Sequence, residues 1–112
     1  MLNKNNSLRK TKEIEAVFKS KKSFYSDFFG VKAIKNNLGL NRIVIIISAK
    51  VSKKAVDRNK IKRRIKAVFI EKNKEMRQGF DCIIILNKDI SKKSFLEINN
   101  LFSYSFKKIG LL

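Results

Sequence analysis

The sequence contains no histidine and a single cysteine, Cys82. Histidine is the usual general base of enzymes and a member of the familiar catalytic triads, so its absence excludes those arrangements. One cysteine can neither form a disulfide within the chain nor supply an ordinary structural zinc site. We therefore expect no catalytic side chain and no metal site, and we interpret Cys82 as a small buried apolar residue.

Acidic residues and long apolar runs are also scarce. Nine Asp and Glu residues oppose 27 Lys and Arg residues, which gives a net charge of +18. A domain with this charge repels itself unless an anion screens it, and nucleic acid is the commonest anionic partner. An anionic membrane surface is the alternative, but runs such as Ile43–Ile47 are too short to span a bilayer. The first ten residues lack the apolar core of a signal peptide, so we expect a cytoplasmic protein with no membrane partner.

The 112 residues contain no proline, internal repeat or low-complexity linker, which favours one domain over residues 1–112. Apolar spacing predicts a helix capped by Thr11, a second ending near Gln78 and Gly79, and a third capped by Ser91 or Ser94. Strands are expected at 28–35, 42–49 and 80–86, with a further one near 24–27, and strand 42–49 is expected to be central because it is apolar on both faces. The prediction is an α/β class domain (an α+β sandwich) in the order α-β-β-β-α-β-α, after a flexible basic arm at residues 1–9.

The stretch AVDRNKIKRRIK, residues 55–66, places six cations on one predicted helix, with Asp57 as its cap and Val56 in the preceding loop. At about 100° per residue, Ile61, Ile65, Val68, Phe69 and Met76 form an apolar stripe that packs on the sheet. Most charge runs are simply solvated helix faces. Here, however, no acid occurs between Arg58 and Ile70 to form stabilising i,i+4 ion pairs, and the cations begin in the first turn, where they oppose the helix dipole.

Asn59 adds a donor and an acceptor despite its poor helix propensity. The pattern therefore favours a polyanion-binding surface over a solvated face. Its predicted members are Arg58, Asn59, Lys60, Lys62, Arg63, Arg64 and Lys66. Exposed aromatic residues next to such a surface can stack on bases, and Phe18 is the best candidate, although core packing is the commoner use. Phe24, Tyr25, Phe28 and Phe29 are weaker candidates.

The same stretch resembles the signature of a known family. Residues 55–63 are similar to the Ala-Val-x-Arg-Asn-Arg-Ile-Lys-Arg run of the protein component of bacterial ribonuclease P, with Lys60 in place of the second arginine. The segments SLRKTKEIEAVFKS, RIVIIISAK and GFDCIIIL extend the resemblance over nearly the whole chain. The resemblance implies an unusual left-handed β-α-β crossover around the loop before the basic helix, where the general rule favours the right-handed form.

Membership would imply a cytoplasmic ribonucleoprotein endonuclease that removes the 5′ leader from precursor tRNA. The partners would be precursor tRNA and the catalytic RNA subunit, which performs the chemistry with bound Mg²⁺. We do not predict a protein homo-oligomer. The basic helix would face the RNA, and a cleft between the first helix and the sheet would hold the leader. The resemblance places Ile14, Phe18 and Lys32 in that cleft and further basic contacts at Arg9, Lys10 and Lys50.

Three of these positions differ in what they offer the leader. Phe18 matches an aromatic position of the family, whereas Ile14 and Lys32 stand where aromatic residues are frequent. Lys32 would then hold a leader phosphate and not a base. From the residues alone, a structural RNA-binding protein such as a ribosomal component remains an alternative. A stand-alone metal-dependent nuclease is disfavoured by the scattered carboxylates.

Overall fold

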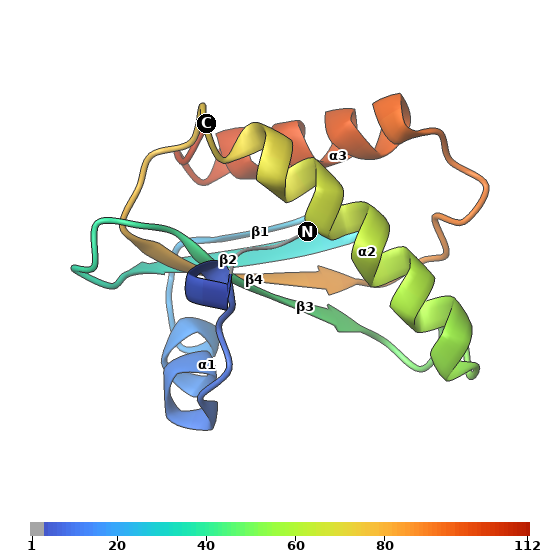
Figure 1. Cartoon of the computed structure of the whole chain (residues 1–112), viewed down its shortest axis with the longest axis horizontal. Helices are drawn as coiled ribbons and strands as arrows, with labels where there is room; N and C mark the ends of the chain where they lie inside the picture. The colour runs from blue at the N-terminus through green and yellow to red at the C-terminus, as the bar shows by residue number, and fades with distance from the viewer. Residues whose placement is uncertain (1–3) are drawn as a thin grey trace.

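The chain forms a four-stranded sheet packed by helices over residues 4–112, the part that the computed structural model describes (Figure 1). The helices are α1 (Thr11–Phe18), α2 (Ala55–Lys72) and α3 (Phe95–Lys108), preceded by a short 3₁₀ turn, η1 (Lys4–Asn6). The strands are β1 (Ser23–Tyr25), β2 (Phe29–Lys35), β3 (Arg42–Ile47) and β4 (Phe80–Leu86). This mixed α+β domain confirms the predicted class and the order α-β-β-β-α-β-α. The further strand predicted near 24–27 corresponds to β1.

The sheet has the order β1-β2-β4-β3, and only β3 and β4 are parallel among its three strand pairs. In Figure 1 the chain runs along β3, returns through α2 above the sheet and enters β4 behind β3. This connection is a left-handed crossover, as the resemblance implied and against the general preference for right-handed ones.

Two apolar clusters lie on opposite faces of the sheet. Successive strand side chains point to opposite faces, so Phe29, Val31 and Ala33 of β2 face α2 and α3 in the main core. Val17 of α1 packs on the other face against Ile83 and other apolar residues. Helix α1 covers one end of that face and leaves the rest without a described helix (Figure 1). The part of this face that α1 leaves uncovered belongs to the candidate site.

Helix α2 ends at Lys72, so the prediction that it continues to Gln78 is wrong. The buried Asn41 is the reason, because its side-chain amide donates to Asn73 Oδ1 at 3.0 Å and to the Arg77 carbonyl oxygen at 2.8 Å. These bonds hold residues 73–77 in a turn. Met76 is buried as predicted, but it reaches the core from this turn and not from the helix.

Strand β3 lies at the edge of the sheet, where the sequence predicted a central strand. Both of its faces are apolar because it has α2 on one side and the second cluster on the other. The segment before α1 covers part of its edge, since the Leu8 N–H donates to the Ile43 carbonyl oxygen at 3.0 Å. Leu8 is buried and Ser7 pairs with Ile43, so residues 7 and 8 pack on β3 and do not belong to a loose arm of the kind predicted for 1–9. Residues 1–3 of that arm lie outside the described residues.

The helix starts differ from the predicted caps. Thr11 is the first residue of α1, and Lys10 precedes it without a side-chain cap. Asp57 does not cap α2 but lies in its first turn, and Val56 is an exposed residue of the same turn and not part of the loop. Ser94 does cap α3 in a capping box with Glu97, and the hydrogen bonds from Ser94 lower the pKa of the Glu97 carboxyl.

Candidate RNA-binding surface

Helix α2 has one side that is basic along its whole N-terminal half. Its buried stripe of Ile61, Ile65, Val68 and Phe69 packs on the core, as the sequence predicted. Spacings of three and four residues place a set of polar side chains together on one side of this stripe. This set, called here the basic flank, consists of Arg58, Asn59, Lys62, Arg63 and Lys66.

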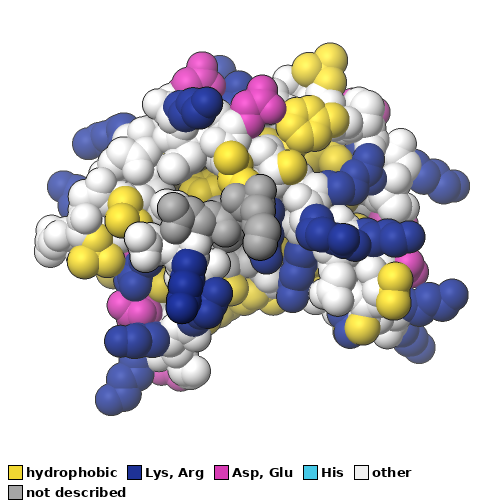
Figure 2. All heavy atoms as spheres, viewed as in Figure 1, with side chains coloured by type: hydrophobic (Ala, Val, Ile, Leu, Met, Phe, Trp, Pro, Cys, Tyr) yellow, Lys and Arg dark blue, Asp and Glu magenta, His cyan; other side chains and the backbone are white. Residues whose placement is uncertain are grey.

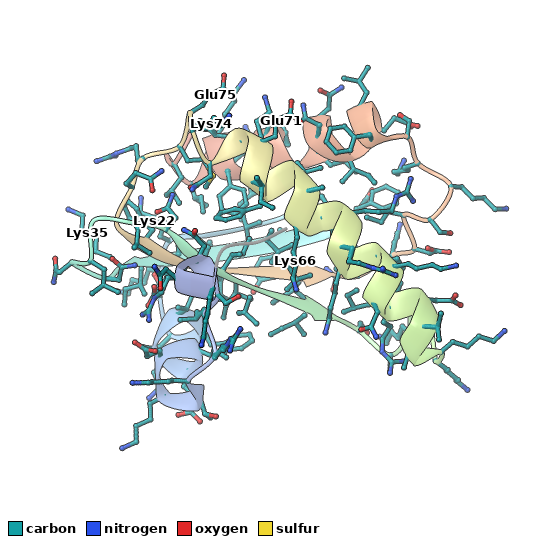
Figure 3. The ribbon with its side chains drawn as sticks, in the orientation of Figure 1. Lys22, Lys35, Lys66, Glu71, Lys74 and Glu75 are labelled. Carbon is teal, nitrogen blue, oxygen red and sulfur yellow. The ribbon has the colours of Figure 1, made fainter. Side chains whose placement is uncertain are left out.

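The charge of α2 changes along its length. Figure 3 shows Lys66 on the side of α2 that faces the sheet edge, and Glu71, Lys74 and Glu75 at the C-terminal end. Figure 2 shows Lys and Arg side chains over the N-terminal half of α2 and around α1, with acidic side chains where α2 ends. A helix normally favours the opposite distribution, with acids near its N-terminus. The arrangement is unfavourable for the isolated helix and favourable for binding a polyanion.

Two predicted binding residues are on the other side of α2. Lys60 and Arg64, together with Asp57 of the same helix, line a cleft of about 710 Å³. The loop before α3 contributes Asp89 and Ser91 to the same cleft. The Arg64 guanidinium donates to the carbonyl oxygens of Ser91 at 3.0 Å and Lys93 at 2.9 Å. Arg64 therefore fastens this loop to α2, so the structure separates it and Lys60 from the basic flank.

The predicted leader cleft lies on the face of the sheet opposite α2 and α3. Ile14 is half-buried in the second cluster, while Phe18, at the end of α1, has 41 % of its surface exposed. Lys32 of β2 is half-buried, and its side chain points to the same face because it alternates with the core residues Val31 and Ala33. The structure thus brings all three predicted cleft residues to one face.

Beyond α1, this face is floored by residues from all four strands. We call this floor the open face: Tyr25, Gly30, Lys32, Ile46 and Ile85. Ile46 and Ile85 are only partly buried although they are large and apolar. Half-covered aliphatic residues with a lysine and a tyrosine beside them form a surface that suits the bases and phosphates of single-stranded RNA.

The remaining aromatic candidates differ in burial. Phe29 is buried in the main core, and Phe24 and Phe28 pack against it. Phe24 also contacts Tyr104 of α3 edge-on, with ring centroids 5.7 Å apart. Tyr25 is more than half exposed and lies on the open face. The sequence ranked Phe18 first and did not separate Tyr25 from the core residues next to it.

The other predicted basic contacts lie at two places. Arg9 and Lys10 are exposed just before α1, and Arg9 borders a hollow with Arg42 and Lys4 near the start of β3. Lys50 is exposed in the loop between β3 and α2. Arg9 and Lys10 thus lie at the start of α1, and Lys50 lies where the chain passes from β3 to α2.

Sequence reasoning missed a charged cluster that holds α1 on the sheet. Arg42 donates to both carboxylate oxygens of Asp81 at 2.7 Å, and its Nη2 also donates to Glu13 of α1 at 2.7 Å. Asp81 is buried, and Asn36 donates to it at 2.8 Å. The hydrogen bonds from Arg42 to Asp81, and to a smaller extent those to Glu13, raise the pKa of the guanidinium above its ordinary value, so Arg42 stays charged. Only the strand register pairs Arg42 with Asp81, so the sequence offered no direct signal.

The acidic residues of the described chain do not gather into a metal site. Among residues 4–112, no three Cys, Asp or Glu side chains lie close enough together to hold a metal ion. Asp89 instead accepts hydrogen bonds from the N–H and hydroxyl of Ser91 at 2.8 and 2.9 Å. Cys82 is fully buried, and its burial raises the pKa of the thiol. No helix in the described part is both long and apolar enough to cross a bilayer.

Comparisons with known proteins agree over almost the whole chain. The family model described as Ribonuclease P matches residues 2–110. The ribonuclease P protein component of Clostridium kluyveri is 37% identical over 106 residues, which cover 93% of this chain and 94% of that protein. The corresponding protein of Clostridium botulinum (strain Loch Maree / Type A3) is 32% identical over 109 residues, covering 96% and 97%. The structure of a Staphylococcus aureus RNase P protein mutant aligns with a TM-score of 0.85 at 25% identity, covering 97% of this chain and 92% of that one.

Proposed function

The chain belongs to the ribonuclease P protein family, and from this premise we propose how it takes part in tRNA processing. The observation that supports the proposal best is an acid-free basic flank on α2 combined with a partly apolar face on the other side of the sheet. The basic flank docks on the RNA subunit of ribonuclease P in the cytoplasm. The open face, bordered by Phe18 at the end of α1, receives the single-stranded 5′ leader of precursor tRNA.

The two surfaces suit different parts of RNA. Lys and Arg side chains neutralise phosphates, which gives affinity without base specificity. Half-buried apolar and aromatic side chains contact unpaired bases. Precursor tRNA carries such bases in its 5′ leader, and mature tRNA has no leader. A protein with both surfaces increases the affinity of the holoenzyme for precursor over mature tRNA.

The chemistry of cleavage is assigned to the RNA subunit. The described carboxylates offer no ligand set for Mg²⁺, so the catalytic Mg²⁺ is held by RNA in this proposal. The cations of this chain act by neutralising phosphate repulsion between the RNA subunit and its substrate. The expected consequence is that less Mg²⁺ is needed when the protein is present.

Reconstitution with the cognate RNA subunit tests this function. We expect the protein to tighten binding of precursor tRNA more than mature tRNA, and to sustain cleavage at Mg²⁺ concentrations where the RNA alone is inactive. An equally basic, unrelated protein is the control for non-specific charge neutralisation. Equal tightening for both tRNAs would favour a general structural RNA-binding protein, and cleavage by the RNA-free protein would assign the chemistry to this chain.

A further inference from the structure

Four residues form one continuous row across the open face. Tyr25 of β1 pairs with Gly30 of β2, Gly30 pairs with Ile85 of β4, and Ile85 pairs with Ile46 of β3. Directly paired residues of neighbouring strands place their side chains on the same face. The row therefore leads from an exposed tyrosine, across a glycine, to two half-buried isoleucines.

Gly30 leaves the space that the Tyr25 ring fills. A Cβ atom added at Gly30 would lie 2.6 Å from both Cδ1 and Cε1 of Tyr25, which is far inside van der Waals contact. Any other residue at position 30 would push the ring away from the sheet. Tyr25 nevertheless keeps 54 % of its surface exposed, so the ring is held over β2 and remains accessible.

A cation lies beside the ring. Lys32 Nζ is 5.9 Å from the centre of the Tyr25 ring, and Lys32 is two residues beyond Gly30 on the same face of β2. An aromatic ring for the base and an ammonium group for the neighbouring phosphate are the two components of a single-strand binding platform. The isoleucines of the row continue the apolar surface next to it.

We propose that Tyr25 stacks on one unpaired base of the 5′ leader, held in place by Gly30, and that Lys32 contacts an adjacent phosphate. The proposal deepens the proposed function and rests on it, because it specifies which residues of the open face recognise the leader. The competing explanation is structural, since an aromatic side chain over a cross-strand glycine also shields the backbone from water. The experiment has to separate these two roles.

Tyr25→Ala is tested in the reconstituted holoenzyme with two substrates, precursor tRNA bearing a leader of about eight nucleotides and mature tRNA. We expect the variant to lose about 5- to 150-fold in affinity for the precursor, the range of one base–aromatic stack, and to bind mature tRNA unchanged. Tyr25→Phe keeps the ring and should stay within about twofold of the natural protein. Gly30→Ala should reproduce the loss, because it displaces the ring without removing it.

Tyr104→Ala is the matched control. Tyr104 is the only other tyrosine of the sequence, it is 52 % exposed, and Lys108 Nζ lies 5.2 Å from its ring centre. It belongs to α3, which packs on the opposite face of the sheet. Replacing Tyr104 should leave the preference for the leader intact. A lysine beside a half-exposed ring is not sufficient to bind the leader when the pair lies outside the open face.

The outcomes separate the possible failures. A natural holoenzyme with no preference for the leader would overturn the proposed function itself. A preserved preference in Tyr25→Ala, or equal losses for both substrates, would overturn only the stacking role. Should Tyr25→Ala fail to fold, fluorine NMR of the full chain with 3-fluorotyrosine decides, because its two tyrosines give two signals that Tyr104→Phe assigns. A single-stranded RNA of the leader sequence should shift the Tyr25 signal, and an unshifted signal overturns the proposal.

Discussion

Arg42 joins three elements through two carboxylates, Glu13 of α1 and Asp81 of β4. The side chain of Arg42 is 16 % exposed and that of Asp81 is 7 % exposed, so solvent screens this pair little. The cluster fixes α1 over one end of the sheet, and Phe18 at the end of α1 borders the open face. The position of a proposed binding residue thus depends on an ion pair distant from it in sequence.

Replacing Asp81 by alanine should lower the free energy of unfolding by about 3 kcal/mol, because Arg42 keeps its charge but loses its most buried partner. Glu75→Ala is the matched control, since Glu75 pairs with Lys72 at 3.3 Å but its side chain is 65 % exposed. It should change stability by less than about 1 kcal/mol. Urea unfolding at fixed ionic strength measures both variants, and equal costs would mean that the Arg42 cluster acts as an ordinary surface pair.

Local pattern predicted the elements better than their boundaries. The stripe of α2 and its cations are readable because both repeat with the helical period. The end of α2 is not readable, because the buried Asn41, which precedes β3 by one residue, holds the turn that follows the helix. The place of β3 at the sheet edge was also hidden, since covered faces make an edge strand as apolar as a central one.

Helix α2 also decides which cations of the predicted set are available to RNA. Arg64 is bound to two carbonyl oxygens of the loop before α3, whereas Arg63, one residue earlier, is exposed on the basic flank. Adjacent residues lie about 100° apart on a helix, so two neighbouring arginines face different surroundings. The run of cations in the sequence cannot separate these roles.

Arg63→Ala should weaken binding of the RNA subunit and reduce the slope of log affinity against log salt by about 1, the effect of one lost phosphate contact. Lys74→Ala removes the same charge beside Glu71 and Glu75 at the other end of α2 and is the control (Figure 3). Its slope should stay close to that of the natural protein. Equal changes in both variants would show that net charge, and not the basic flank, determines binding.

The positions that combine to make the open face come from four strands and become neighbours only through the register of the sheet. For that reason Tyr25 and Gly30 could not be paired from the sequence, although both are visible in it. The resemblance predicts a cleft that includes Phe18 and Lys32, and the structure places Tyr25 beside Lys32. On the scale of the whole molecule, this proposed recognition surface is part of a domain whose net charge is +18.

That charge makes the folded chain itself sensitive to salt. The molecule measures 36 × 27 × 27 Å, while electrostatic interactions extend over about 30 Å at 10 mM salt and about 8 Å at 150 mM. At low salt nearly every cation therefore repels every other, and the compact state is destabilised relative to the unfolded chain.

We expect the melting temperature to rise by about 4 °C or more between these salt concentrations, as followed by circular dichroism. A variant with Lys→Glu at four exposed positions away from the basic flank should melt higher at low salt and respond less to added salt, because each exchange replaces a positive charge by a negative one. These positions are Lys12, Lys19, Lys35 and Lys74. A natural protein whose melting temperature is constant over this range would show that self-repulsion does not limit its stability.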